Sequence, residues 1–295
     1  MLASAVGRWF RRSPAATTGA AAVTVVPPAP VVAVPRRTRW PPERMALADS
    51  LWGEGFGFPG GEAEVLRLTR SLGPTAAHSL LLVGGGAGGA ACAITQAFGA
   101  WVAAMETEPE LVAAGQRLIA GTGLGRKVSI GLWQPNEPVF ETRKYHCCAA
   151  LEPLIGAQPE PILDALAGAL KPAGQLVMTE LVAEQALDPA EPGVARWAVL
   201  ERRNLACVVA PVAVSRMLGR AGMDVRIAED LSDRHVEQMV RGWRKRVRDL
   251  SGTHPDRASA AQLVAEAERW LLRWRLMKDG RLRMMRWHAI SRGAG

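Results

Sequence analysis

The sequence predicts an α/β fold with a seven-stranded, mostly parallel, doubly wound sheet. Two observations favour it. Helical and strand patterns alternate from residue 62 onward, and strands that are separated by helices form parallel sheets. A largely apolar run at 79–83 ends in glycines, which is typical of a strand that is buried on both faces. The pattern also predicts an antiparallel last strand and extra helices near the C-terminus.

The expected strands are short apolar runs bounded by turn-forming or polar residues. In order along the chain they are 79–83, 101–105, 127–133, 145–151, 175–182, 223–227 and 281–290. The fifth follows a turn at Lys171-Pro-Ala-Gly. The alternation of the last strand predicts a place at a sheet edge, where one face meets solvent or a helix end.

The expected helices carry apolar residues at helical spacing. They cover residues 62–72, 90–98, 109–119, 161–170, 195–204, 211–221, 232–247 and 259–278. Thr107 and Pro109 supply a capping hydroxyl and an early proline for the third helix. Ser232 caps the seventh helix, and Gly280 ends the eighth.

Composition divides the chain into an N-terminal tail and one domain. Residues 1–42 hold six arginines and no acidic residue, and prolines interrupt the apolar runs. We therefore expect a disordered tail, with a cleaved secretory signal or an organelle transit segment as alternatives. Residues 43–295 form a single domain with three parts, namely an N-terminal segment at 43–61, a core at 62–190, and C-terminal helices with closing strands at 191–295.

The net charge of +8 is unevenly distributed. Residues 43–240 carry −7 and residues 241–295 carry +9. The acidic body argues against a broad phosphate-binding footprint, so a nucleic-acid partner is disfavoured, although arginines between the tryptophans of 269–275 keep RNA as a minor alternative. No apolar run reaches the roughly 18 residues of a membrane span, and the cysteines form no metal-ligand pattern. We expect a cytoplasmic protein without a metal.

A glycine cluster follows the first strand and opens a helix. Gly84, Gly85, Gly86 and Gly88 belong to this cluster, where the backbone can approach a ligand closely and the helix presents free N–H groups. Glu106 ends the second strand, and a carboxylate there can accept hydrogen bonds from both hydroxyls of a ribose. This order of strand, glycines, helix, strand and acid predicts a ligand that contains a nucleoside. The alternative is a tight structural turn beside a solvated acid.

Three segments resemble motifs of the class I S-adenosylmethionine-dependent methyltransferases. Residues 83–112 (VGGGAGGAACAITQAFGAWVAAMETEPELV) are similar to the first two motifs of these enzymes. Residues 165–179 (ALAGALKPAGQLVMT) resemble the "LKPGG" turn and fifth strand, and 218–230 resemble the "aGF" turn and sixth strand. The resemblance implies a Rossmann-like methyltransferase fold and S-adenosylmethionine as cofactor, with the glycines beside its methionine part and Glu106 on its ribose.

The sequence departs from this family at two anchor positions. The acid that usually precedes the first glycine is replaced by Leu82. The acid that usually follows the third strand and holds the adenine amino group is also missing. Gln134 is expected to accept that hydrogen bond, and Trp133 is expected to stack on the ring.

Residues 50–61 (SLWGEGFGFPGG) resemble the "FGEGFxSxGG" segment of phosphoethanolamine and glycine/sarcosine-type N-methyltransferases. In those enzymes the segment forms a lid over the cofactor. The resemblance implies that Trp52, Gly55 and Phe56 help to close the site. The alternative is a helix-to-loop junction whose aromatic side chains only pack.

No catalytic residue can be assigned with the same support. The tyrosine and histidine of those N-methyltransferases have no counterparts, because Tyr145, at the start of the fourth strand, is the only tyrosine and the segment directly after that strand, LEPLIG, contains no histidine. Glu152, just past that strand at the carboxyl edge of the sheet, is the weak candidate for a substrate-facing carboxylate. Its alternative role is that of an ordinary loop acid.

These observations favour methyl transfer to a small-molecule acceptor, such as an amine or a hydroxylated compound. The alternative is a catalytically degenerate protein that keeps the fold as a binding or scaffold module. Leu82 and the missing acid after the third strand support that alternative.

Overall fold

The structure is a computed structural model that describes residues 38–251 and 255–292. The first 37 residues of the predicted tail lie outside the described residues. Residues 38–42, which the sequence assigned to the same tail, contact the folded body. Arg39 forms an ion pair with Glu108 at 3.0 Å, and the Trp40 side chain is buried in the core.

The described residues form a seven-stranded sheet in the order β3-β2-β1-β4-β5-β7-β6. The strands are β1 Ser79–Val83, β2 Trp101–Glu106, β3 Val128–Leu132, β4 Tyr145–Leu151, β5 Leu170–Val182, β6 Met223–Asp230 and β7 Arg283–Ser291. Strands β1 to β5 pair in parallel, and β7 is antiparallel to both β5 and β6. The predicted mostly parallel sheet with an antiparallel last strand is confirmed.

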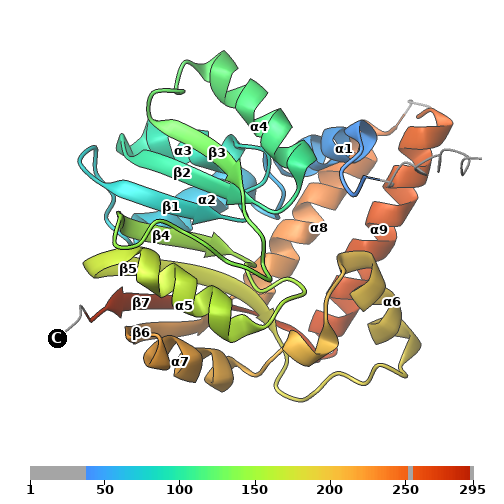
Figure 1. The fold of residues 1–295 in the computed structure, drawn as a ribbon. Helices are drawn as coiled ribbons and strands as arrows, with labels where there is room; N and C mark the ends of the chain where they lie inside the picture. Colours follow the sequence, from blue (N-terminus) through green and yellow to red (C-terminus); the bar gives the residue numbers. More distant parts are fainter. Residues whose placement is uncertain (1–37, 252–254, 293–295) are drawn as a thin grey trace, which may run out of the picture. The chain divides into compact units, whose positions relative to one another are not determined.

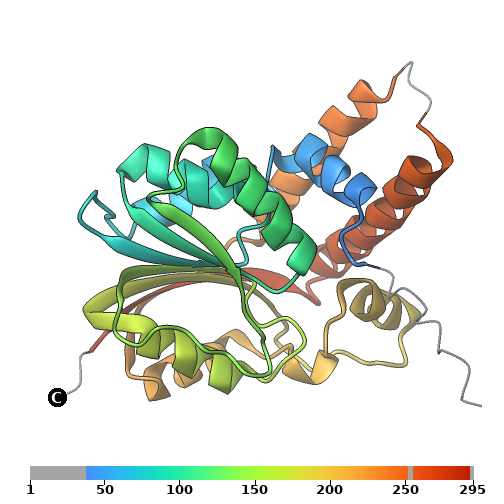
Figure 2. The same ribbon diagram turned by 45° about the horizontal axis from the view of Figure 1, so that its top comes forward.

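Helices cover both faces of this sheet (Figures 1 and 2). They are α1 Pro42–Trp52, α2 Gly61–Arg70, α3 Gly89–Phe98, α4 Pro109–Thr122, α5 Pro159–Ala169, α6 Pro192–Glu201, α7 Pro211–Arg220, α8 Ser232–Asp249 and α9 Arg257–Lys278, with a 3₁₀ turn at Leu205–Cys207. Alternate residues of β1 enter two cores, because Leu80 and Leu82 pack with α2 and α3 while Leu81 and Val83 pack with α5. The sheet is therefore doubly wound, as predicted.

The last strand does not lie at the sheet edge, so this part of the prediction is wrong. Strand β7 is inserted between β5 and β6, and Met284, Met285 and Trp287 are buried on its two faces. The exposed edge is β6, whose residues after Val225 are mostly solvent-accessible. The polar residues that gave β7 its alternation are accommodated by partners, as when Arg286 pairs with Glu229 at 3.0 Å.

The predicted turn at Lys171-Pro-Ala-Gly lies inside β5. Strand β5 begins at Leu170, opposite Tyr145, and its register shifts before Gln175 pairs with Cys147. Ala173 takes a positive φ of 59° at this irregularity. The turn residues thus produce a bulge in a longer strand and do not separate a helix from a strand.

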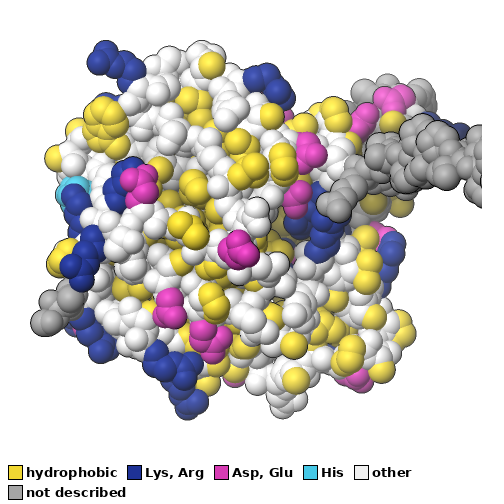
Figure 3. Space-filling model, viewed as in Figure 1, with side chains coloured by type: hydrophobic (Ala, Val, Ile, Leu, Met, Phe, Trp, Pro, Cys, Tyr) yellow, Lys and Arg dark blue, Asp and Glu magenta, His cyan; other side chains and the backbone are white. Residues whose placement is uncertain are grey.

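The two C-terminal helices, α8 and α9, lie beyond the carboxyl ends of the parallel strands and diverge from each other (Figure 2). Helix α1 contacts both of them. None of the helices in the described residues combines the length and apolar composition that a bilayer crossing requires. Acidic and basic side chains both occur on the face drawn in Figure 3. This face is therefore not uniformly positive, although the net charge of the chain is positive.

The insertion of β7 predicts a large stability cost for truncating its central tryptophan. Trp287 is fully buried, and its Nε1 donates to Ser215 Oγ at 2.9 Å. We expect Trp287→Ala to lower the free energy of unfolding by about 3–5 kcal/mol. Trp101→Ala is the control, since Trp101 is 50% exposed at the start of β2. Similar losses for both variants in urea denaturation would contradict the interior position of β7.

Candidate functional site

The glycine cluster forms a tight turn between β1 and α3. Gly84, Gly86 and Gly88 all have φ near +80 to +90°, a conformation that side chains disfavour. Space is equally restrictive, because a Cβ on Gly84 would lie 2.2 Å from the Leu151 carbonyl oxygen and one on Gly86 would lie 2.6 Å from the Gly57 nitrogen. Both conformation and close approach therefore require glycine here.

Glu106 lies at the end of β2, beside this turn. Its carboxylate is buried and accepts a hydrogen bond from the Gly86 N–H. Burial raises the pKa of Glu106 to about 7, against the opposing effect of hydrogen bonds from Gly86 and Thr107. The structure thus brings together the glycines and the acid that the sequence singled out.

The segment between α1 and α2 lies directly on the glycine turn. The Gly55 carbonyl accepts a hydrogen bond from the Gly89 N–H at 3.2 Å, at the N-terminus of α3. The Gly55 N–H in turn donates to Asp49 Oδ1 at 2.8 Å. Two segments about thirty residues apart thus meet backbone to backbone, with Gly57 against Gly86.

The aromatic residues of this segment have separate roles. Trp52 contacts the Trp270 ring edge to face, with centroids 5.2 Å apart, and a Cβ on Gly242 would lie 2.3 Å from the Trp52 ring. Trp52 therefore fastens α1 to α8 and α9 and does not face the glycine turn. Phe56 is buried and packs against Phe58, with centroids 6.0 Å apart.

The two residues that the sequence predicts beside adenine, both just after β3, differ in their exposure to solvent. Trp133 is buried in the core on the α5 side of the sheet, with its ring 5.5 Å from that of Phe140. Gln134 is exposed, and so is Leu132, which pairs with Glu106 across the strands. Only the polar residue of the predicted pair is accessible to a ligand at the surface.

A cavity of about 120 Å³ lies at the carboxyl ends of β1, β4 and β5, next to Gly84. It is walled by the segment between α1 and α2 and by residues of α8 and α9. Its lining consists of Gly57, Phe58, Pro59, Glu64, Leu68, Gly84, Leu151, Glu152, Thr179, Leu231, Arg234, His235, Gln238, Arg269, Trp270, Arg273 and Met284. The weak candidate Glu152 does line this cavity.

Glu152 is held by two arginines. Arg273 donates to both of its carboxylate oxygens at 2.8 and 3.0 Å, and Arg203 forms a third contact. Burial alone would raise the pKa of Glu152, but the two guanidinium groups lower it to about 2. Glu152 is therefore ionised at neutral pH and is an ion-pair partner as well as a wall of the cavity.

The same arginines bind two further buried carboxylates. Arg273 forms a bidentate pair with Glu201 at 2.8 and 2.6 Å, and Arg203 donates to Glu180 at 2.7 Å. Sequence reasoning missed these residues, because they come from β5, α6, the loop after α6, and α9, which are far apart in the chain. One signal was present, since Glu180 is a charged residue within the apolar run of β5, and buried charges need partners.

His235 is a second polar residue of the cavity that the sequence did not identify. It lies in the first turn of α8, where burial, together with the charge of Arg273, lowers its pKa to about 4. Arg273 Nη1 lies 3.4 Å from its Nε2, and because a guanidinium only donates, Nε2 is the acceptor. At neutral pH the cavity therefore contains an uncharged imidazole.

No group of three or more histidine, cysteine or acidic side chains within 38–251 and 255–292 is arranged to hold a metal ion. No protein-family model matches the sequence, and no curated protein matches it. Similarity is found only by comparing structures.

Solved structures of methyltransferases resemble the chain in fold. Phosphoethanolamine N-methyltransferase 2 of Haemonchus contortus, in complex with phosphomonomethylethanolamine and S-adenosylhomocysteine, is 14% identical with a TM-score of 0.72 over 85% of this chain and 58% of that one. Geranyl diphosphate C-methyltransferase of Streptomyces coelicolor A3(2), in complex with Mg²⁺, geranyl diphosphate and S-adenosylhomocysteine, is 13% identical with a TM-score of 0.61 over 85% and 98%. The [4+2]-cyclase SpnF is 16% identical with a TM-score of 0.65 over 87% and 93%.

These comparisons show that the chain has the class I methyltransferase fold. The chain spans a little over half the length of the phosphoethanolamine N-methyltransferase that it resembles. At these identities the likeness concerns the fold, and function must be argued from the site.

The raised pKa of Glu106 predicts a pH-dependent stability. The folded protein binds the proton more tightly than the unfolded chain, so this stabilisation is complete below pH 4.5 and is lost as the pH rises through about 7. Glu106→Gln removes the effect, and we expect the variant to be more stable than the wild type by about 3 kcal/mol near pH 8, with no difference near pH 4. Glu110→Gln is the control. A pH-independent difference in urea denaturation would contradict the burial of an ionisable carboxyl.

The charge network predicts that losing one arginine is costly. Arg273→Met leaves Glu152 and Glu201 without their shared partner, and we expect a loss of about 3–5 kcal/mol in unfolding free energy. Arg196→Met breaks an exposed pair with Glu268 and is expected to cost at most about 1 kcal/mol. Equal effects of the two substitutions would show that the buried network does not form.

Proposed function

We propose that the protein transfers a methyl group from S-adenosylmethionine to a small-molecule acceptor. The single observation that carries the proposal is the meeting of Glu106 with the glycine turn at the carboxyl ends of β1 and β2. Ligands bind at this edge of doubly wound sheets. The S-adenosylhomocysteine named with two of the structures of this fold supports the choice of ligand.

The residues present fit such a cofactor. Gly84, Gly85, Gly86 and Gly88 carry no side chain, so the turn would admit the methionine part once the segment between α1 and α2 moves away from Gly86. Glu106 offers a carboxylate to the two ribose hydroxyls. The exposed Gln134 and Leu132 would flank the adenine, whereas the buried Trp133 would support the loop from beneath.

The cavity next to Gly84 is where the acceptor would meet the methyl group. When bound, the cofactor supplies an electrophilic methyl group on a sulfonium. His235 and Thr179 line the cavity and offer hydrogen-bonding groups that could orient an acceptor. His235 is not suited to take its proton, because its Nε2 already accepts from Arg273 and its pKa is lowered to about 4. Glu152 fixes Arg273 against His235, so its part is to position the wall of the cavity.

Binding requires the segment between α1 and α2 to move. Ligand pockets usually measure about 300–1,000 Å³, whereas this cavity measures about 120 Å³. Gly53 and Gly60, which flank the segment, both have positive φ, and glycines tolerate the dihedral changes of a hinge. These glycines support a lid role for the segment, with Gly55 and Gly57 against the turn and Phe58 at the cavity. Of the predicted lid residues, Trp52 contacts Trp270 instead of the turn.

A degenerate binding module is the second candidate. Leu82 is buried in the core beneath the glycine turn and leaves the cofactor's amino-acid end without the usual acid. The fold also accommodates other chemistry, as the [4+2]-cyclase shows by its name. This candidate keeps the buried charge network as a structural feature and needs no cofactor.

Calorimetric titration with S-adenosylmethionine and with S-adenosylhomocysteine separates the two candidates. We expect both to bind the wild type. Glu106→Gln should weaken binding tenfold or more, since a charge-assisted pair of hydrogen bonds contributes about 1.5–3 kcal/mol. Glu110→Gln removes a neighbouring charge and should leave the affinity unchanged. Absence of binding to the wild type would favour the degenerate module, and equal binding by both variants would remove Glu106 from the site.

A further inference from the structure

An apolar groove separate from the candidate site lies between α8 and α9. Its volume is about 730 Å³, within the range of pockets that bind small molecules. The lining consists of Met239, Val240, Trp243, Arg244, Val247, Arg248, Ala267, Trp270, Leu271 and Trp274. Tryptophans and aliphatic side chains predominate, and the arginines come from α8 alone.

The groove exposes apolar surface that the fold itself does not cover. Val247 is 63% exposed and Leu271 is 45% exposed, one from each helix. Trp52 packs against Trp270 and Gly242 from the α1 side, so α1 does not fill the groove. Contiguous exposed apolar surface of this kind marks a binding site more often than a solvated face.

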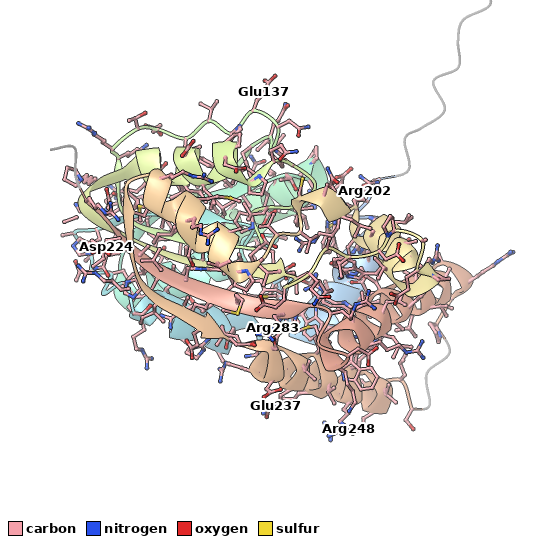
Figure 4. All side chains as sticks on the ribbon, turned by 90° about the horizontal axis from the view of Figure 1, so that it is seen from below. Glu137, Arg202, Asp224, Glu237, Arg248 and Arg283 are labelled. Atoms are coloured by element: carbon pink, nitrogen blue, oxygen red, sulfur yellow. The ribbon has the colours of Figure 1, made fainter. Side chains whose placement is uncertain are left out.

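The arginines of α8 differ in how they are paired. Arg234 pairs with Glu64 at 2.7 Å, and Arg241 pairs with Glu237 at 2.6 Å. Among the residues that the structure describes, Arg244 and Arg248 have no carboxylate partner, and they lie one helical turn apart on the side of the groove. Figure 4 shows Arg248 extending from α8 at the outer surface.

We propose that this groove binds an anionic amphiphile whose apolar chain lies on Trp243, Trp274 and Leu271 and whose acidic group pairs with Arg244 and Arg248. A carboxylate matches the guanidinium groups, and an alkyl chain matches the tryptophan faces. The site lies on the far side of Trp270 from the cavity, because Trp270 lines both.

Other occupants fit less well. A second copy of the chain would bring its own arginines to the groove and would be repelled. The N-terminal segment 1–37 has five arginines and no acid, so it cannot supply the anionic group. A bilayer surface is matched by a convex apolar face, whereas this one is concave between two helices.

The test is a titration of the full chain with dibromostearate, kept below its micelle concentration, because bromine quenches tryptophan fluorescence on contact. We expect saturable quenching of part of the emission. Leu271→Asp places a negative charge in the groove, which repels the acidic group, and should weaken binding tenfold or more. Val212→Asp is the matched control, since Val212 lies on α7, is 53% exposed and does not line the groove, and it should bind as the wild type does.

The arginine contacts are tested with the corresponding brominated alcohol. The double variant Arg244→Gln with Arg248→Gln should lose affinity for the acid but not for the alcohol. No saturable quenching, or undiminished quenching in Leu271→Asp, would overturn the proposal. A concentration-dependent dimer in sedimentation that Leu271→Asp abolishes would also overturn it, in favour of a second copy as the occupant. The outcome does not depend on methyl transfer.

Discussion

Two buried arginines, Arg203 and Arg273, hold the carboxyl edge of the sheet to the helices that follow it. Between them they bind carboxylates from the end of β4, from β5 and from α6. Removing one partner of a buried ion pair costs more free energy than the intact pair contributes, so these elements hold one another in position. The wall of the cavity is held in the same way, because Arg273 belongs to the network and also contacts His235.

The balance of charge in this network is uneven. Three carboxylates face two guanidinium groups, and burial raises the pKa of Glu180 while the pKa values of Glu152 and Glu201 are lowered by Arg273. Glu180 is therefore the member that most readily takes up a proton. Its remaining hydrogen bonds come from the backbone of Leu154 and Leu181, which ties it to the sheet and not to the cavity.

Local patterns predicted the elements well because periodicity and capping act within a few residues. The glycine turn and Glu106 were likewise predictable, since they follow consecutive strands. The position of β7 between β5 and β6 was not predictable, because it depends on which distant strands β7 pairs with. Trp133 was predicted to stack on a ligand, but its side chain is buried in the core. The charge network joins residues up to 121 positions apart, such as Glu152 and Arg273, and no spacing rule predicts contacts at such separations.

The glycine turn and Glu106 connect burial of the site to its electrostatics. Glu106 is buried beside the turn, and this burial disfavours its charged form. Under the proposed function, ribose hydroxyls would donate to this carboxylate and favour its ionised form. The hydroxyl donors of the ligand would then replace the water molecules that burial excludes from the carboxylate, and this would offset the cost of burying its charge. Because hydrogen bonds are stronger in an environment without water, the burial that raises the pKa of Glu106 would also strengthen its contact with a diol.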